Sequence, residues 1–175
     1  MADHLTIRSA RENEYLEVHS FVSLCKPLES YWEHFFKIML RYFGNTCYIA
    51  EQEGRIVGWV MGFFSQKQPG TYFLWQIGVH PENRGQRLGQ QLLKHLEKQL
   101  QNMDACRIEL TIDPENVASR QLFEKNGYEN ISSREGLIIQ INGRDAVKDY
   151  YKPGRHFMLY EKALHERAAQ KDSSA

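Results

Sequence analysis

A mainly apolar and aromatic stretch, Thr71 to Val79 (TYFLWQIGV), lies near the middle of the chain. It shows no helical stripe, so the pattern predicts a strand that is buried on both faces. Pro81 and Asn83 end this strand. After a short glycine-containing turn, leucines recur at helical spacing, at positions 88, 92, 93, 96 and 100. The middle of the chain is therefore predicted to form a strand, a turn and an amphipathic helix.

Similar patterns predict the elements that precede this unit. Alternation and hairpin-type turn chemistry indicate strands at residues 4–8, 46–51 and 55–64, the last two joined by Glu53-Gly54. Helical spacing indicates a helix from about residue 9 to 24, with Leu16, Phe21 and Leu24 facing inward. A second, strongly aromatic helix is predicted from about residue 30 to 43.

The second half of the chain continues in the same alternating manner. The predicted elements are a strand at 106–112, a helix at 117–125, a hairpin of 137–141 and 144–147 around Asn142-Gly143, and a closing strand within 148–164. Residues 165–175 are small and polar and are expected to form a flexible tail. The sequence thus predicts one α+β domain over residues 1–164. Its mixed central sheet has about seven strands flanked by helices, with an extra C-terminal hairpin.

The turn Arg84-Gly85-Gln86-Arg87-Leu88-Gly89 carries the first chemical signal. A glycine-bearing turn between a strand and a helix presents several backbone N–H groups at the positive end of the helix dipole. Such an arrangement is suited to binding a phosphate group.

Two motifs resemble those of the GNAT acetyltransferase superfamily. The first is the turn at residues 84–89, similar to [QR]-x-x-G-x-[GA], although Arg87 stands where the middle glycine is expected. A side chain is tolerated there if the backbone keeps φ negative. The second is N-x-x-S-x-x-L-F-E-K-N-G-Y at residues 116–128, similar to N-x-x-A-x-x-L-Y-x-x-x-G-[FY]. The resemblance implies the GNAT fold over roughly residues 5–164, with acetyl-CoA as cosubstrate.

The same resemblance implies the residues that bind the cofactor. They are the strand residues Ile77, Gly78 and Val79, the turn residues Arg84, Gly85, Gln86, Arg87, Leu88 and Gly89, and Asn116, Ser119 and Phe123. Phe123 departs from the family pattern, because the family tyrosine at this position is often assigned as the acid that protonates the leaving thiolate. Phenylalanine has no proton to donate.

A closer partial resemblance is to the diaminobutyrate acetyltransferases. It rests on Pro27-Leu28 before an aromatic helix, on FGNTCYIAEQEGRIVGWV, on FLWQIGVHP and on TIDPEN, and it fades in the C-terminal third. It implies an amine acceptor, with diaminobutyrate itself as one candidate. The residues expected to contact the acceptor are Tyr31, Trp32, Trp75, Gln76 and Thr111.

The proton transfers that amine acetylation requires indicate candidate catalytic residues. An acceptor ammonium with a pKa of about 10 must lose a proton before it attacks a thioester. Glu109 lies on a predicted central strand, on the face opposite Leu110 and Ile112, and is the candidate base. The thiolate leaves either unassisted or with a proton from Tyr150, Tyr151 or His156.

Composition limits the partners. Lys and Arg together number 22, as do Asp and Glu, so no basic surface indicates binding to nucleic acid or to an anionic membrane. Three widely separated cysteines suit reduced thiols better than disulfides or a metal site. No signal peptide or long apolar run is present, which favours the cytoplasm. The expected partner is a small-molecule amine, a homodimer stays open, and no metal is expected.

Three functions remain open from the sequence. The first is an N-acetyltransferase for a small amine or amino acid, acting by direct transfer in a ternary complex. The second is an acetyltransferase for a protein N-terminus or lysine. The third is a CoA-binding module without turnover, which Phe123 and Arg87 bring into consideration.

Overall fold

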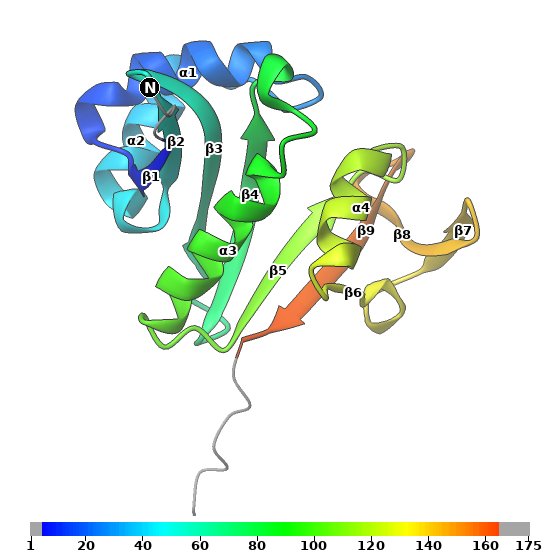
Figure 1. The fold of residues 1–175 in the computed structure, drawn as a ribbon. Coiled ribbons are helices and arrows are strands. Elements are labelled where there is room, and N and C mark those ends of the chain that lie inside the picture. Colours follow the sequence, from blue (N-terminus) through cyan, green and yellow to red (C-terminus); the bar gives the residue numbers. More distant parts are fainter. Residues whose placement is uncertain (1–4, 165–175) are drawn as a thin grey trace, which may run out of the picture.

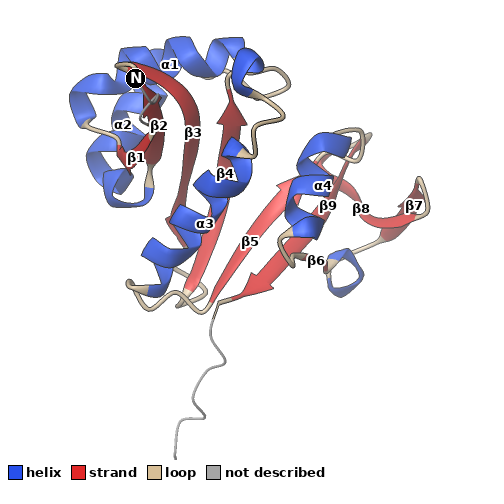
Figure 2. Cartoon of the chain, viewed as in Figure 1, coloured by secondary structure: helices blue, strands red, loops and turns tan. Residues whose placement is uncertain are grey.

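The computed structural model describes residues 5–164, and within them a large mixed sheet is flanked by four α-helices (Figure 1). The helices are α1 (Tyr15–Leu24), α2 (Glu33–Phe43), α3 (Leu88–Gln101) and α4 (Val117–Lys125). The strands are β1 (Thr6–Ser9), β2 (Tyr48–Gln52), β3 (Arg55–Phe64), β4 (Thr71–Val79), β5 (Arg107–Ile112), β6 (Glu129–Asn130), β7 (Ile138–Ile141), β8 (Arg144–Lys152) and β9 (Arg155–Ala163). Figure 2 shows the same elements by type.

The strands are joined in the order β1-β2-β3-β4-β5-β9-β8-β7, and β6 pairs separately with β9. Only the β4–β5 pair is parallel, because α3 crosses over between these two strands. The predicted α+β class and mixed sheet are confirmed. The described residues form nine strands, and the extra C-terminal hairpin, predicted beside a central sheet of about seven strands, supplies two of them, β7 and β8.

Two apolar cores lie on the two faces of this sheet. On one face, α3 contributes a row of fully buried leucines, and Phe123 of α4 packs with Met158 and Tyr160 of β9. On the other face, α1 and α2 pack on Trp59 and Met61 of β3. Strand alternation within β3 divides its side chains between these cores, which explains the long apolar run that the sequence shows there.

Both hairpin turns that the sequence indicated are formed. Glu53 and Gly54 join β2 to β3, and Asn142 and Gly143 join β7 to β8, with positive φ angles at all four residues. A two-residue turn of this kind needs left-handed backbone at both positions, which asparagine and glycine adopt most easily. The predicted C-terminal hairpin is therefore confirmed, although its second strand runs on to Lys152.

Several element boundaries differ from those predicted. The first predicted helix becomes a short 3-10 turn, Glu12–Glu14, followed by α1. Leu16 and Leu24 are exposed rather than inward, because α1 turns Val18, Phe21 and Val22 toward the core. The predicted closing strand at 148–164 divides into the end of β8 and all of β9, with a turn at Pro153-Gly154 between them. The predicted tail at 165–175 lies outside the described residues.

β4 and β5 pair over only three positions and then diverge (Figure 1). The paired residues are Thr71 with Arg107, Tyr72 with Ile108, and Phe73 with Glu109. Near this point, the β3–β4 register shifts so that Trp75 is an extra residue in β4. Such a β-bulge redirects the strand. The rest of β4 therefore has β3 on one edge and no strand partner on the other.

Candidate active site

The start of α3 offers backbone N–H groups without partners inside the helix. The first helical bond is donated by the N–H of Gln91 to the carbonyl of Arg87, at 3.1 Å. The N–H groups of Leu88, Gly89 and Gln90 therefore have no partner in the preceding turn, and no side chain caps this end. The positive end of the α3 dipole and the free N–H groups together are suited to binding an anion.

Arg87 adopts the left-handed conformation at this helix start, with φ of 60° and ψ of 14°. The expectation that an arginine is tolerated because φ stays negative is therefore wrong. The backbone keeps the conformation that a glycine adopts easily, and Arg87 adopts it at a steric cost. Its side chain is exposed.

The free edge of β4 faces this helix start. The N–H of His80 donates to the carbonyl of Val57 on β3, so by strand alternation the main-chain groups of Val79 and Ile77 face the other edge. The carbonyl of Val79 accepts a hydrogen bond from Nε of Arg84 at 3.3 Å. Arg84 also donates to the carbonyl of Lys26 at 2.8 Å, so its guanidinium holds the turn to the segment after α1.

The glycines around this edge allow close packing. A Cβ atom on Gly78 would lie 2.4 Å from a methyl carbon of Leu28, so a larger residue there would require the Leu28 side chain to move. A Cβ atom on Gly89 would make ordinary contacts with Leu122 at 3.5 Å and Val79 at 3.7 Å. Gly85 has a φ of 78° and open space around it, and Gln86 is exposed beside it.

α4 begins beside the diverging strands. Asn116 caps it, with Oδ1 accepting a hydrogen bond from the N–H of Ser119 at 3.0 Å. Phe123 is almost fully buried and packs edge to face on Tyr128, with ring centroids 5.0 Å apart. Its ring thus fills the core between α4 and the sheet, which is an apolar role that phenylalanine fulfils and that needs no hydroxyl.

Aromatic rings gather on the opposite face, where β4 bulges. Trp75 contacts four other rings, with centroids about 6 Å away: Tyr31, Phe35, Phe63 and Phe73. Nε1 of Trp75 donates to the Tyr31 hydroxyl at 3.2 Å, and that hydroxyl donates to Oε2 of Glu29 at 2.9 Å. Burial raises the pKa of Tyr31 to about 12, so this phenol stays protonated at neutral pH.

Two further residues expected at the acceptor, Trp32 and Gln76, lie differently. Trp32 precedes α2 and is three-quarters exposed. Gln76 is buried, and its amide is engaged within the protein. It accepts from Nε1 of Trp59 at 3.3 Å and donates to the carbonyl of Glu29 at 2.7 Å. Gln76 thereby holds the segment that carries Glu29 and Tyr31 against β4.

Glu109 lies on the aromatic face of β5 within a group of charges. Its Oε1 is 2.7 Å from Nε of Arg107, which also lies 3.4 Å from Oε2 of Glu161 on β9. Arg107 donates further to Gln68 at 3.0 Å. Arg107 thus neutralises two carboxylates that are direct cross-strand neighbours.

Two tyrosines of β8 reach this face from the other side. The hydroxyls of Tyr151 and Thr111 are 2.9 Å apart, and Tyr151 packs on Phe157 and Tyr150 with ring centroids at 4.7 Å. Burial raises the pKa of Tyr150, and the charges of Glu135 and Glu109 add to the shift. The phenol of Tyr151 also adds to the raised pKa of Tyr31, so the two side chains lie near each other. These residues therefore surround one region, from Tyr31 and Trp75 across Glu109 and Thr111 to β8.

His156 does not belong to this group. Strand alternation on β9 places it on the face of Met158 and Tyr160, opposite Phe157. Its Nδ1 accepts a hydrogen bond from the backbone N–H of Asp149 at 3.0 Å. The structure therefore gives His156 a main-chain partner and separates it from the other candidate catalytic side chains.

The sequence profile of the acetyltransferase (GNAT) family matches residues 11–128, about two thirds of the chain. The chain belongs to the acetyltransferase (GNAT) family. The predicted superfamily is thereby confirmed, and the matched part includes α3, the turn before it and the whole of α4. The β6–β9 region lies beyond it.

Two similar proteins align with about two thirds of this chain. An L-2,4-diaminobutyric acid acetyltransferase of Bordetella parapertussis is 33% identical over 118 residues, which are 67% of this chain and 63% of that protein. One of Vibrio cholerae is 34% identical over 118 residues, covering 67% and 68%. The chain thus spans about two thirds of the length of these relatives. The predicted resemblance to diaminobutyrate acetyltransferases is confirmed.

Solved structures show the shared fold. A diaminobutyrate acetyltransferase from Paenibacillus lautus, in complex with L-2,4-diaminobutyric acid and coenzyme A, matches 94% of this chain and 98% of its own with a TM-score of 0.74 and 22% identity. The ribosomal-protein-S18-alanine N-acetyltransferase from Escherichia coli matches 95% and 98%, with a TM-score of 0.71 and 16% identity. The GNAT fold predicted from the motifs is therefore confirmed.

Some side chains of this GNAT site gave no signal in the sequence. Arg107 and Glu29 were missed, because the contacts that place them, from Arg107 to Glu161 and from Gln76 to the carbonyl of Glu29, join distant segments. Asp149 was also missed, although an aspartate before two tyrosines in a strand pattern can indicate an irregular, left-handed position.

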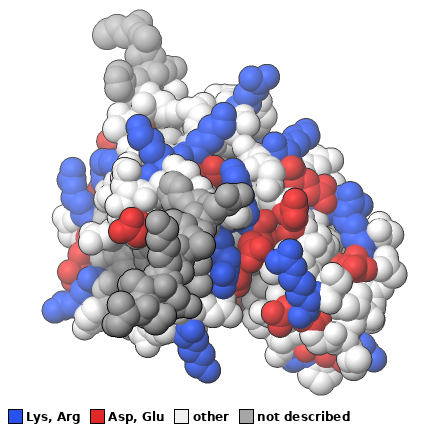
Figure 3. All heavy atoms as spheres, turned by 90° about the horizontal axis from the view of Figure 1, so that it is seen from below, with Lys and Arg blue, Asp and Glu red and all other residues white. Residues whose placement is uncertain are grey.

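Surface properties of the described residues add little to this site. Over residues 5–164, no cluster of three or more His, Cys, Asp or Glu side chains is arranged to hold a metal ion, and no helix is long and apolar enough to cross a membrane. Acidic and basic side chains are interspersed on the face shown in Figure 3. The three cysteines are free, and Cys25 and Cys47 are buried.

Proposed function

We propose that this chain is an acetyl-CoA-dependent N-acetyltransferase for a small primary amine. The observation that carries the proposal is the divergence of β4 and β5. On one side of it lie the uncapped start of α3 and the free edge of β4. On the other side lies the region of aromatic, hydroxyl and carboxylate groups. A thioester that enters between the strands would reach both.

The α3 turn supports the cofactor part of the proposal. Free N–H groups of Leu88 to Gln90 would receive the pyrophosphate, with Arg87 and Arg84 as the nearby cations. The main-chain groups of Ile77 and the N–H of Val79, on the edge of β4 that has no strand partner, would receive the amide groups of the pantetheine arm. Coenzyme A, which is bound in the Paenibacillus lautus structure, fits this set of donors.

The acceptor side supports an amine substrate. Aromatic faces attract a cation, and the region also holds two carboxylates, those of Glu29 beside Tyr31 and of Glu109 on β5. The relatives from Bordetella parapertussis and Vibrio cholerae are named for L-2,4-diaminobutyric acid, which carries two amino groups. We therefore take that compound as the first substrate to test.

In the proposed reaction, the acceptor ammonium loses a proton to Glu109, directly or through water. The amine nitrogen attacks the thioester carbonyl carbon, the carbon–sulfur bond breaks, and the coenzyme A thiolate leaves. Tyr150 keeps its proton at neutral pH, because burial raises its pKa. It, or Tyr151, is then available to protonate the thiolate. Phe123 takes no part. The free cysteines favour a reducing, cytoplasmic setting.

A second acceptor class is favoured by the neighbouring structure from Escherichia coli, an enzyme named for an alanine of ribosomal protein S18. In this chain the hairpin-side tyrosine Tyr151 is more than half exposed, so one side of the region is open enough for a peptide. The small amine stays the first proposal, because the relatives with higher identity are named for one.

The test is thiol release from acetyl-CoA with a matched panel. The panel contains L-2,4-diaminobutyrate, its one-carbon-longer homologue, a monoamine of equal length, free lysine and short peptides with free N-termini. The expected result is the highest kcat/KM for a diamine. A peptide preference would replace the acceptor class, and acetyl-CoA binding without release on any acceptor would support the CoA-binding module.

A further inference from the structure

The β8–β9 hairpin contains an unusually large irregularity. Val147 pairs with Phe157, and the next pair is Lys152 with Arg155. Residues 148–151 of β8 therefore face His156 alone on β9. Within this segment, Asp149 has a left-handed backbone with φ of 53°. We call residues 148–151 the β8 bulge.

His156 and Asp149 hold the β8 bulge together. The backbone N–H of Asp149 donates to Nδ1 of His156 at 3.0 Å. The Asp149 carboxylate accepts from the N–H of Gly154 at 2.7 Å and lies 3.5 Å from the same imidazole nitrogen. As an acceptor, Nδ1 carries a lone pair, so the neutral imidazole has its proton on Nε2.

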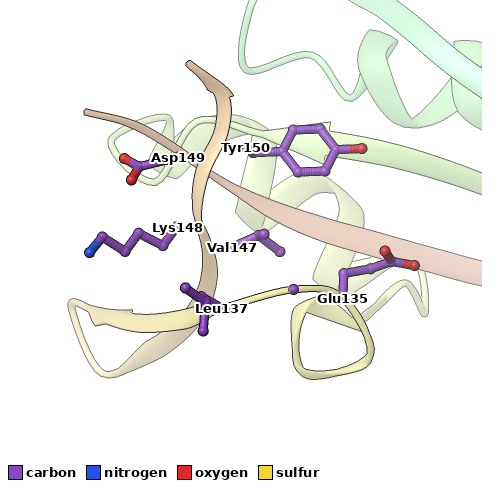
Figure 4. A pocket seen from close by; sticks show the side chains of 7 residues that line it. Glu135, Leu137, Val147, Lys148, Asp149 and Tyr150 are labelled. Carbon is purple, nitrogen blue, oxygen red and sulfur yellow. The ribbon is translucent and has the colours of Figure 1, made fainter. Parts of the chain in front are cut away.

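The β8 bulge carries two consecutive tyrosines. In a regular strand, side chains of consecutive residues point to opposite faces. Here the rings of Tyr150 and Tyr151 contact each other, with centroids 4.7 Å apart. In Figure 4, Tyr150 and Glu135 lie on one side of β8, and Lys148 and Asp149 lie on the other. The left-handed backbone at Asp149 thus interrupts the strand alternation, so that the side chains of the two tyrosines can lie next to each other.

Both tyrosines reach groups of the candidate site as a result. The hydroxyls of Tyr151 and Thr111 lie 2.9 Å apart, and Tyr150 packs on Tyr151, close enough to Glu109 for that carboxylate to add to the raised pKa of Tyr150. Below Tyr150, an open hollow of about 430 Å³ lies between the β8 bulge and the loop at Glu135–Leu137 (Figure 4). On that side the β8 bulge is held by one main-chain hydrogen bond, from the N–H of Lys148 to the carbonyl of Leu137 at 2.7 Å, and the left-handed turn at Asp149 is held by the His156 and Asp149 contacts.

We propose that His156 is a positioning residue, which fixes the β8 bulge through Asp149 and thereby sets Tyr150 and Tyr151 as one wall of the acceptor site. This inference rests on the proposed function for its consequence in turnover. It assigns His156 a structural hydrogen bond rather than a proton transfer. The hairpin then determines which acceptors fit, whereas the α3 turn determines cofactor binding.

The test compares His156→Leu with His156→Asn. An asparagine Oδ1 lies where Nδ1 lies and accepts the same hydrogen bond, whereas leucine cannot. For His156→Leu we expect the KM for the amine to rise about tenfold or more, with the KM for acetyl-CoA nearly unchanged, because a small misplacement of a positioning group is costly. His156→Asn should restore the amine KM to near the wild-type value.

A second readout does not depend on activity. Hydrogen exchange of the Asp149 backbone amide should be slow in the wild type and in His156→Asn, and fast in His156→Leu. The NMR chemical shifts of the Tyr150 and Tyr151 ring protons should change only in His156→Leu. If the wild type acetylates no amine, the proposed function fails, yet these signals still decide the positioning role. If His156→Leu does not fold, the nitrogen shift of Nδ1 in the wild type decides, because a protonated Nδ1 would overturn the inference. It is also overturned if His156→Asn is as impaired as His156→Leu.

Discussion

The Nε atom of Arg107 lies 2.7 Å from Oε1 of Glu109, two residues away on the same face of β5. The same nitrogen is 3.4 Å from Glu161, the cross-strand neighbour of Glu109. One cation thus orients two carboxylates at the point where β4 and β5 part. Glu109 lies nearest the divergence, since it is the last residue of β5 that pairs with β4.

Replacing Glu109 by glutamine should lower kcat at least about 100-fold, because general base help of this kind is worth about 10²- to 10⁴-fold. Binding of coenzyme A, measured by calorimetry, should stay unchanged. Glu161→Gln is the matched control, since it removes a carboxylate from the same arginine and should keep most activity. A Glu109→Gln enzyme with near-full kcat would remove Glu109 from the mechanism.

Two substitutions at Gly89 test the cofactor site. A Cβ there makes ordinary contacts, so Gly89→Ala should fold and bind coenzyme A within a few-fold of wild type. Gly89→Glu places a longer, anionic side chain beside the free N–H groups and should abolish binding by repulsion of the phosphates. Calorimetry on both folded variants gives the comparison. Equal affinity for the two would place the cofactor elsewhere.

Arg87 combines a left-handed backbone with a cation at the positive end of a helix. Left-handed conformation in a residue other than glycine costs about 1–3 kcal/mol, so Arg87→Gly should unfold at a higher temperature than Arg87→Ala. Both variants should raise the KM for acetyl-CoA more at low salt than at high salt, because salt screens the phosphate attraction. If KM is unchanged at both salt concentrations, the side chain has no role in binding.

Phe123→Tyr should gain little or no activity. The ring is almost fully buried against Tyr128, so an added hydroxyl enters an apolar core without a partner. Burying such a group costs about 1–3 kcal/mol, which a lowered melting temperature would reveal. A large increase in kcat, with unchanged stability, would show that this position faces the thiolate.

The Arg8–Glu14 pair predicts a pH dependence of stability. Hydrogen bonds from Arg8 hold the pKa of the buried Glu14 carboxyl below its ordinary value of 4.5. The pair therefore stabilises the fold above about pH 4.5, and this contribution is lost as pH falls through the lowered pKa. Glu14→Gln should cost about 1.5–3 kcal/mol at pH 7 and much less below pH 4. Urea unfolding at several pH values measures the difference, and a constant difference would contradict it.

Much of the fold followed from local patterns. The leucines of α3, the apolar run of β4 and the Asn142-Gly143 turn each indicate one structure by their own chemistry. The inward orientation predicted for Leu16 and Leu24 was wrong. The buried face of α1, with Val18, Phe21 and Val22, is set by the packing of α2 against it, which the sequence of α1 alone does not show.

The candidate site was less predictable than the fold. The α3 turn is local in sequence, so its free N–H groups could be anticipated, although the left-handed φ of Arg87 could not. Other contacts join distant segments: Glu161 shares Arg107 with Glu109 across two strands, and Trp75 donates to Tyr31 from β4. His156 has suitable chemistry for proton transfer, but strand alternation on β9 turns it to the other face.

The three-pair ladder between β4 and β5 has a consequence for how the protein unfolds. β1–β4 and β5–β9 are separate runs of main-chain hydrogen bonds, and the three pairs and the apolar core under α3 and α4 join them. Two such runs can open as distinct cooperative units. A molecule that binds both strand edges would hold these two units together. The protein would then resist thermal unfolding and proteolysis better, and the gain would grow as the Kd of that molecule falls.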